Sequence, residues 1–215
     1  LNDNFTRVKI RKILNQYPDW KHKFAYTSNN LSKARDCIEY LLNQSIDNFV
    51  TLFPQGYASI KTLDFNSLPQ EIRFRLLERV LQTISIENKP PRGERIERLV
   101  NKIEDLNSFT TSTLAGCLII LKKDALIITR EYSKIENNLF LTPKQDNNIL
   151  WDYRLPIFIG EKLPSQYAPL VINRVKEEDW PELKKKLTKE QLSIPKAVIL
   201  GLPAIRILEK LLAIP

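Results

Sequence analysis

The sequence predicts an α+β protein with a helical first half and a mixed, mainly β second half. Apolar residues recur at helical spacing before residue 107. After residue 108, short runs rich in β-branched residues are joined by polar turns, and most of the 13 prolines lie beyond residue 140. We therefore expect a helical domain over residues 1–107 and a mixed, mainly β domain over residues 108–215.

The first long element is predicted over residues 20–53, as one helix or a broken pair, because apolar residues there keep the helical period. Pro54 and Gly56 would end it. Residues 57–64 alternate weakly between apolar and polar and predict a short extended segment.

A capping box predicts the start of the next helix. Ser67 would accept a bond from the Gln70 amide, Gln70 would reach back to the Ser67 amide, and Pro69 is tolerated in a first turn. A further helix is expected after the break at residues 88–93. Each helix would bury one stripe of apolar residues, namely Ile72, Leu76, Leu77, Val80, Leu81 and Ile84 in the first, and Ile96, Leu99, Val100, Ile103 and Leu106 in the second.

The second half opens with a predicted hairpin, in which residues 114–121 and 125–130 flank a polar turn. Residues 150–159 and 169–174 are further extended candidates. The last stretch, residues 194–215, has helical spacing but could instead form two strands around Glu209 and Lys210.

Net charge and cysteine content limit the function classes. The chain carries a net charge of +8, which favours a polyanionic partner, although an inert basic surface fits equally well. Cys37 and Cys117 are expected to be buried free thiols in a reducing compartment. His22 is the only histidine, so a structural zinc site of about four ligands is excluded for the monomer. No apolar run approaches the ~18 residues of a membrane span, and we expect a cytoplasmic protein.

Catalytic motifs are scarce. With five glycines, the chain contains no phosphate-binding glycine loop, and His22, among charged neighbours, is expected at the surface. Lys184–Lys186 fits a solvated face or a phosphate contact. Trp151–Arg154 fits core packing at a strand start or base stacking.

The opening segment is the best functional candidate. It lacks a methionine and is strongly basic, so we expect the chain to be the back part of a larger protein, entered through a cationic helix. Arg7 and Arg11 are four residues apart, which on a helix places both on one face, where they could hold the same phosphate or carboxylate. Solvated helix arginines are the alternative.

Several short stretches, taken in order, resemble the tRNA(Ile)-lysidine synthetases. No single stretch is very specific, but their succession covers nearly the whole chain. The stretches are Phe5–Arg11, Ser67–Pro69, Thr111–Cys117, Arg130–Glu131, Trp151–Arg154 and Leu202–Ala204.

The resemblance implies a role beside an ATP-binding domain that this sequence does not contain. Members of that family carry a PP-loop domain whose Ser-Gly-Gly-x-Asp-Ser loop holds ATP. They adenylate the wobble cytidine of the isoleucine tRNA with anticodon CAU, and lysine then displaces AMP. By resemblance, ATP, Mg²⁺ and lysine would bind outside this chain, which would hold no cofactor of its own. The last segment would then form strands.

Within the family, an Arg-x-x-x-Arg segment closes the ATP-binding domain, and by resemblance that role falls on Arg7 and Arg11. Val8 stands where relatives often have Asn, so no role of that Asn is carried over.

The leading hypothesis is the non-catalytic, tRNA-recognising portion of such a ligase, inactive alone, with a homodimer as one alternative for its assembly. By resemblance, residues 1–107 would be the helical linker or substrate-binding domain and residues 108–215 the mainly β tRNA-binding domain. The alternative is a helical and β protein-interaction module whose basic charge is incidental. We expect no catalytic or metal-binding residue in this chain. The candidate RNA-binding residues are Arg7, Lys9, Arg11, Lys12, Arg92, Arg95 and Arg130.

Overall fold

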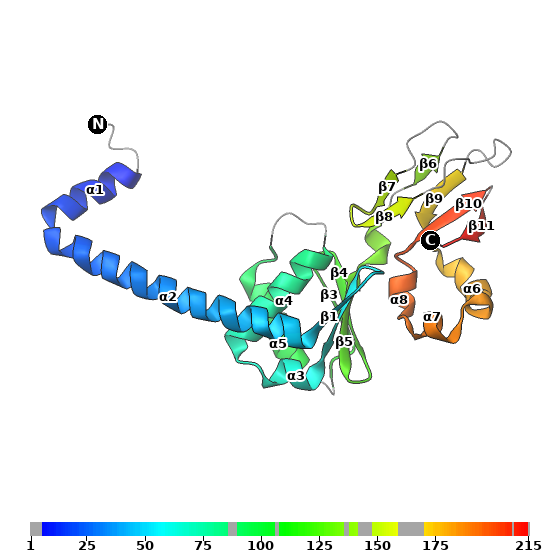
Figure 1. Cartoon of the computed structure of the whole chain (residues 1–215), viewed down its shortest axis with the longest axis horizontal. Helices are drawn as coiled ribbons and strands as arrows, with labels where there is room; N and C mark the ends of the chain where they lie inside the picture. The colour runs from blue at the N-terminus through cyan, green and yellow to red at the C-terminus, as the bar shows by residue number, and fades with distance from the viewer. Residues whose placement is uncertain are drawn as a thin grey trace. The chain divides into compact units, whose positions relative to one another are not determined.

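The computed structural model describes residues 6–85, 90–105, 108–135, 138–141, 148–158, 170–207 and 209–214. The chain divides into two compact units, Leu1–Ser45 and Ile46–Pro215. Helices predominate at the N-terminal side and sheets follow, which confirms the α+β fold class (Figure 1). Leu1 to Phe5, Leu106, Ile159 and Pro169, on which several predictions fell, lie outside the described residues.

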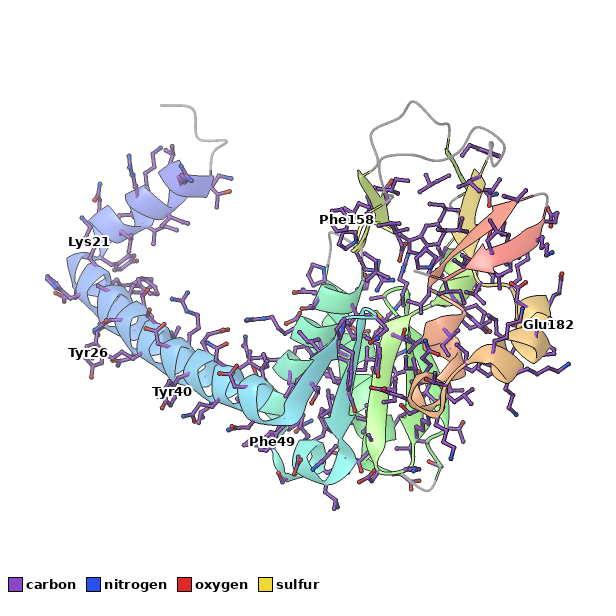
Figure 2. All side chains as sticks on the ribbon, turned by 45° about the vertical axis from the view of Figure 1, so that its right-hand side comes forward. Lys21, Tyr26, Tyr40, Phe49, Phe158 and Glu182 are labelled. Carbon is purple, nitrogen blue, oxygen red and sulfur yellow. The ribbon has the colours of Figure 1, made fainter. Side chains whose placement is uncertain are left out.

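The first unit is helical. It contains α1 (Thr6–Gln16), which buries no residue, and most of α2 (Pro18–Phe49). Pro18 explains the break between them, because proline has no N–H for a continuing helix and disfavours helical geometry in the residue before it. Tyr26 and Tyr40 project from α2 and are exposed (Figure 2). Contrary to the prediction of a helix up to Phe53, α2 ends at Phe49, because the next four residues form a strand.

A five-stranded antiparallel sheet begins the second unit. Its strands are β1 (Val50–Phe53), β2 (Tyr57–Lys61), β3 (Thr111–Leu114), β4 (Cys117–Lys122) and β5 (Ala125–Arg130), in the order β1-β2-β5-β4-β3. The hairpin predicted within residues 114–130 is confirmed as β4 and β5. The domain boundary expected near residue 107 falls between α5 (Gly93–Glu104) and β3, and this sheet takes strands from both sides of it. Separate roles for residues 1–107 and 108–215 stay a prediction.

Three helices accompany this sheet: α3 (Thr62–Ser67), α4 (Gln70–Ile84) and α5. Helix α4 packs on β2 and β5, and α5 packs on α4 (Figure 1). The predicted apolar stripes are confirmed, since all six named residues of α4 are buried, as are Ile96, Leu99, Val100 and Ile103 of α5.

The predicted capping box at Ser67 is wrong. The N-cap residue of α4 is Pro69, which makes no side-chain cap. Ser67 is instead the last residue of α3, and its hydroxyl donates to the Asp64 carbonyl at 2.7 Å. Helix α3 begins at Thr62, inside the segment over residues 57–64 that was predicted to be extended. Ser67 therefore ends one helix and does not cap the next.

The described residues of the rest of this unit form two further sheets. A four-stranded antiparallel sheet has the order β11-β10-β9-β6, and β7 pairs with β8. The last segment contains two strands, as the resemblance implied, but a short helix precedes them. The strands are β6 (Leu139–Leu141), β7 (Asn148–Trp151), β8 (Leu155–Phe158), β9 (Leu170–Arg174), β10 (Pro203–Ile207) and β11 (Lys210–Ala213), and the helices are α6 (Trp180–Lys186), α7 (Lys189–Ser193) and α8 (Lys196–Ile199).

Trp151 is fully buried and donates its indole N–H to the Gly201 carbonyl at 3.1 Å. Of the two interpretations of Trp151–Arg154, core packing therefore holds for Trp151. Cys117 is buried, as expected, whereas Cys37 lies exposed on α2, so that part of the thiol prediction is wrong. Among the described residues, no helix combines the length and apolar character that a bilayer crossing requires.

Candidate nucleic-acid interface

A basic groove of about 410 Å³ lies between α5 and the turn that joins β3 to β4. Four of its lining residues are basic and one is acidic. The lining consists of Arg95, Arg98, Leu99, Lys102, Ser112, Thr113, Leu114, Ala115, Gly116, Glu131 and Lys134.

One wall of the groove is the polar face of α5. Arg95, Arg98 and Lys102 are spaced three, four and seven residues apart, which places them on one side of a helix. The buried apolar stripe lies on the neighbouring side of the helix and includes Leu99, which also lines the groove, so packing against α4 leaves the basic side exposed. Arg92 is the N-cap residue of α5, one turn ahead of Arg95, and is also exposed.

The other wall is a tight two-residue turn. Ala115 and Gly116 have φ values of 50° and 67° and join the paired residues Leu114 and Cys117. Two successive positive φ values are typical of type I′ hairpin turns, which glycine adopts without strain. The turn belongs to the Thr-Ser-Thr-Leu-Ala-Gly run over residues 111–116, one of the stretches that carry the family resemblance.

The Gly116 carbonyl is held from the interior. It accepts hydrogen bonds from Arg130 Nη1 at 2.8 Å and from the Glu131 amide at 2.9 Å. The shape of this wall therefore depends partly on Arg130, a buried residue that is not part of the groove surface.

The positive charge of the groove is only partly neutralised. Arg98 pairs with Glu94 at 3.6 Å and Lys134 with Glu131 at 3.7 Å. Such exposed pairs contribute little and leave the basic groups available to another anion. No ion pair between described residues involves Arg95 or Lys102, so these two are the strongest candidates for an anionic ligand.

The structure places the predicted RNA-binding residues in three locations. Arg7, Lys9, Arg11 and Lys12 are exposed on α1 in the first unit, and Arg92 and Arg95 are exposed on α5 in the second. Arg130 is only 5% exposed and bonded to Gly116, which does not favour the phosphate contact predicted for it.

Sequence reasoning missed Arg98, Lys102 and Lys134 as groove residues. The spacing of Arg95, Arg98 and Lys102 was the signal available, since it places all three on one side of α5, beside the apolar stripe. Lys134 carried no such signal, because it reaches the groove only through the fold of the chain after β5.

The other residues singled out from the sequence lie outside this groove. His22 is exposed on α2. In the part of the chain that the structure describes, no three His, Cys, Asp or Glu side chains are grouped to hold a metal ion. Lys184–Lys186 are exposed in the last turn of α6, where lysine side chains interact favourably with the helix dipole.

Comparison with known proteins shows similarity to a class of tRNA-modifying enzymes. The relatives it finds include the tRNA(Ile)-lysidine synthases of several Rickettsia species, so the resemblance read from the motifs is confirmed. The chain is 29% identical over 182 residues to the Rickettsia rickettsii protein, covering 81% of this chain and 36% of that protein. For Rickettsia felis the identity is again 29%, with 40% of that protein covered.

The chain thus spans between about a third and two fifths of the length of the curated relatives it matches. No model of a known protein family matches the sequence.

Proposed function

We propose that this chain is the non-catalytic, tRNA-recognising portion of a tRNA(Ile)-lysidine synthase. Such a protein ligates lysine to the wobble cytidine of the isoleucine tRNA with anticodon CAU, using ATP. The observation that carries the proposal is the groove itself, where basic residues of α5 face a turn formed by one of the resemblance stretches.

The groove offers the contacts that folded RNA requires. Proteins recognise RNA helices mostly through phosphates and 2′-hydroxyls. Arg95 and Lys102 would each contact a phosphate, and the Ser112 and Thr113 side chains could donate to or accept from 2′-hydroxyls. Arg7, Lys9, Arg11 and Lys12 would add phosphate contacts from the first unit.

By the family resemblance, ATP, Mg²⁺ and lysine would be bound by a separate ATP-binding domain that carries a Ser-Gly-Gly-x-Asp-Ser loop. We also propose that the protein is located in the cytoplasm and that it forms a homodimer. This chain incubated with tRNA, ATP and lysine should form no lysidine, as measured by nucleoside analysis of the tRNA. Formation of lysidine would contradict the non-catalytic assignment.

Binding to tRNA tests the recognition role. In a filter-binding titration, affinity should be weak and should fall steeply as salt rises, because neutralising phosphates releases counterions. The Arg95→Gln/Lys102→Gln double variant should reduce the slope of log affinity against log salt by about two, about one for each lost contact.

A matched control is the Lys185→Gln/Lys189→Gln double variant, which loses the same charge at two exposed positions outside the groove. It should keep a slope close to that of the wild type. Equal effects of the two double variants would mean that net charge, and not the groove, binds the RNA.

The alternative function, a protein-interaction module, is favoured by one observation. The first unit exposes several large apolar side chains on α1 and in the first turns of α2, including Ile10, Ile13, Trp20 and Phe24. No binding to tRNA, or binding that ignores salt, would favour this alternative.

A further inference from the structure

The groove wall is connected to a buried charge cluster, formed by Arg130, Asp152 and Arg154, that the proposed binding contacts do not include. Asp152 is 2% exposed. Its Oδ2 lies 3.4 Å from Arg130 Nε, 2.7 Å from Arg154 Nη2 and 2.9 Å from Arg154 Nε. One carboxylate thus faces two guanidinium groups in the interior.

We propose that the Arg130–Asp152 pair is the positioning element of the basic groove, holding the Ala115–Gly116 turn in the shape that a folded RNA requires. The inference rests on the proposed function and extends it to two residues that would not touch the RNA.

The first link runs from the turn to Arg130. Arg130 is paired in register with Cys117, the residue directly after the turn. Its Nη1 donates to the Gly116 carbonyl at 2.8 Å. Because this carbonyl belongs to the second turn residue, the position of the guanidinium sets the position of the groove wall.

The second link runs from Arg130 to Asp152. Arg130 Nε is buried and has no hydrogen-bond acceptor among the described residues. The attraction to Asp152 at 3.4 Å is therefore one of charge, which is little screened at this depth. Without the carboxylate, the buried guanidinium would lack a counter-charge and would move towards solvent, taking the Gly116 contact with it.

Asp152 is itself rigidly placed. It lies in the turn between β7 and β8, where Asp152 and Tyr153 have φ values of 46° and 55°. Such backbone strain persists only where the surroundings hold it. Here the buried Trp151 holds one end of the turn through its bond to Gly201, and the Arg154 amide donates to the Trp151 carbonyl at 2.9 Å.

Arg154 also pairs with Asp152, but its other contact lies outside the groove. Its Nη1 donates to the Gly56 carbonyl at 3.1 Å, in the turn between β1 and β2. Arg130 and Arg154 therefore share one carboxylate and each hold one glycine carbonyl, but only the glycine bonded to Arg130 lines the groove.

This symmetry supplies a matched pair of variants, Arg130→Met and Arg154→Met. Each removes one buried guanidinium, leaves a one-to-one ion pair with Asp152 and takes one donor from a glycine carbonyl. We expect Arg130→Met to weaken binding to folded tRNA by about 5- to 30-fold, the factor that corresponds to 1–2 kcal/mol. Arg154→Met should stay within about twofold of the wild type, since it leaves the groove wall in place.

Two readouts separate positioning from simple loss of stability or charge. Arg130→Met should bind heparin, a flexible polyanion, as the wild type does, and should keep the wild-type salt slope for tRNA, because no phosphate contact is lost. Hydrogen exchange at the Glu131 amide, which donates to Gly116, should speed up in Arg130→Met and not in Arg154→Met.

Asp152→Asn completes the set, because it keeps the side-chain shape and removes only the charge. Its tRNA affinity and the exchange rate of its Glu131 amide should change as they do in Arg130→Met. If Asp152→Asn fails to fold, Arg130→Met and Arg154→Met still test the positioning role. Equal tRNA affinity of the two methionine variants, or equal exchange at Glu131, would overturn the positioning role. A wild-type chain that does not bind tRNA would overturn the proposed function. The exchange measurement would still show whether Arg130 holds the Gly116 carbonyl in place.

Discussion

Buried arginines organise this protein at the scale of single residues. Arg206 on β10 is 3% exposed and pairs with Asp179, and it also donates to Asn173 Oδ1 at 2.7 Å and to the Glu209 carbonyl at 3.3 Å. Burial alone would raise the pKa of Asp179. Hydrogen bonds from Arg206 and the Lys176 amide, with the positive charges of both side chains, outweigh burial and lower this pKa below its ordinary value.

This lowered pKa predicts how stability depends on pH. A carboxyl whose pKa is lower in the folded state stabilises the fold above its unfolded pKa, and this stability is lost as pH falls through the folded value. Asp179→Asn should therefore cost about 3–5 kcal/mol at neutral pH, because it leaves Arg206 buried without its counter-charge.

Urea unfolding of Asp179→Asn and wild type at a series of pH values checks this expectation. The difference in unfolding free energy should be constant near neutral pH and should shrink as pH falls below about 4, the ordinary range of an aspartate. A difference that stays constant down to pH 3 would contradict the ion-pair explanation.

The β3–β4 turn gives a prediction at the scale of elements. Ala115 adopts a φ of 50°, which costs a residue with a Cβ roughly 1 kcal/mol. Asparagine tolerates this region, and Asn-Gly is favoured in type I′ turns. Ala115→Asn should thus raise the unfolding free energy by about 0.5–1 kcal/mol, measured by urea unfolding, and Ala115→Val should lower it.

Elements with strong periodicity could be predicted from the sequence, and those shaped by neighbours could not. The stripe of α4 and the β4–β5 hairpin are visible because packing follows the pattern of the residues themselves. The end of α2 was missed because Val50 and Phe53 continue a helical period, whereas in the structure they pair with Ile60 and Tyr57. Strand pairing thus overrode a local signal.

The groove was predictable only in part for the same reason. Arg95 was chosen from charge, but its position across the groove from Ala115 and Gly116 depends on the order of strands in the sheet. Arg130 was predicted to contact phosphate, and the sequence alone cannot show that it is buried with Asp152, 22 positions later, 3.4 Å from its guanidinium.

For the whole molecule, charge is spread and not concentrated. The 17 basic and 13 acidic residues before position 108, and the 16 and 12 after it, give each half a charge of +4. Such a distribution suits a large folded polyanion that is contacted at several separated places. Within the second unit, the groove beside α5 is a concave surface lined by four of these basic residues.

The salt dependence of tRNA binding by wild type and by the Arg95→Gln/Lys102→Gln variant tests the central claim most directly, namely that this groove contacts RNA phosphates. The account predicts a steep wild-type slope that falls by about two in this variant and stays unchanged in Lys185→Gln/Lys189→Gln. A wild-type slope near zero, or the same slope in all three proteins, would contradict it.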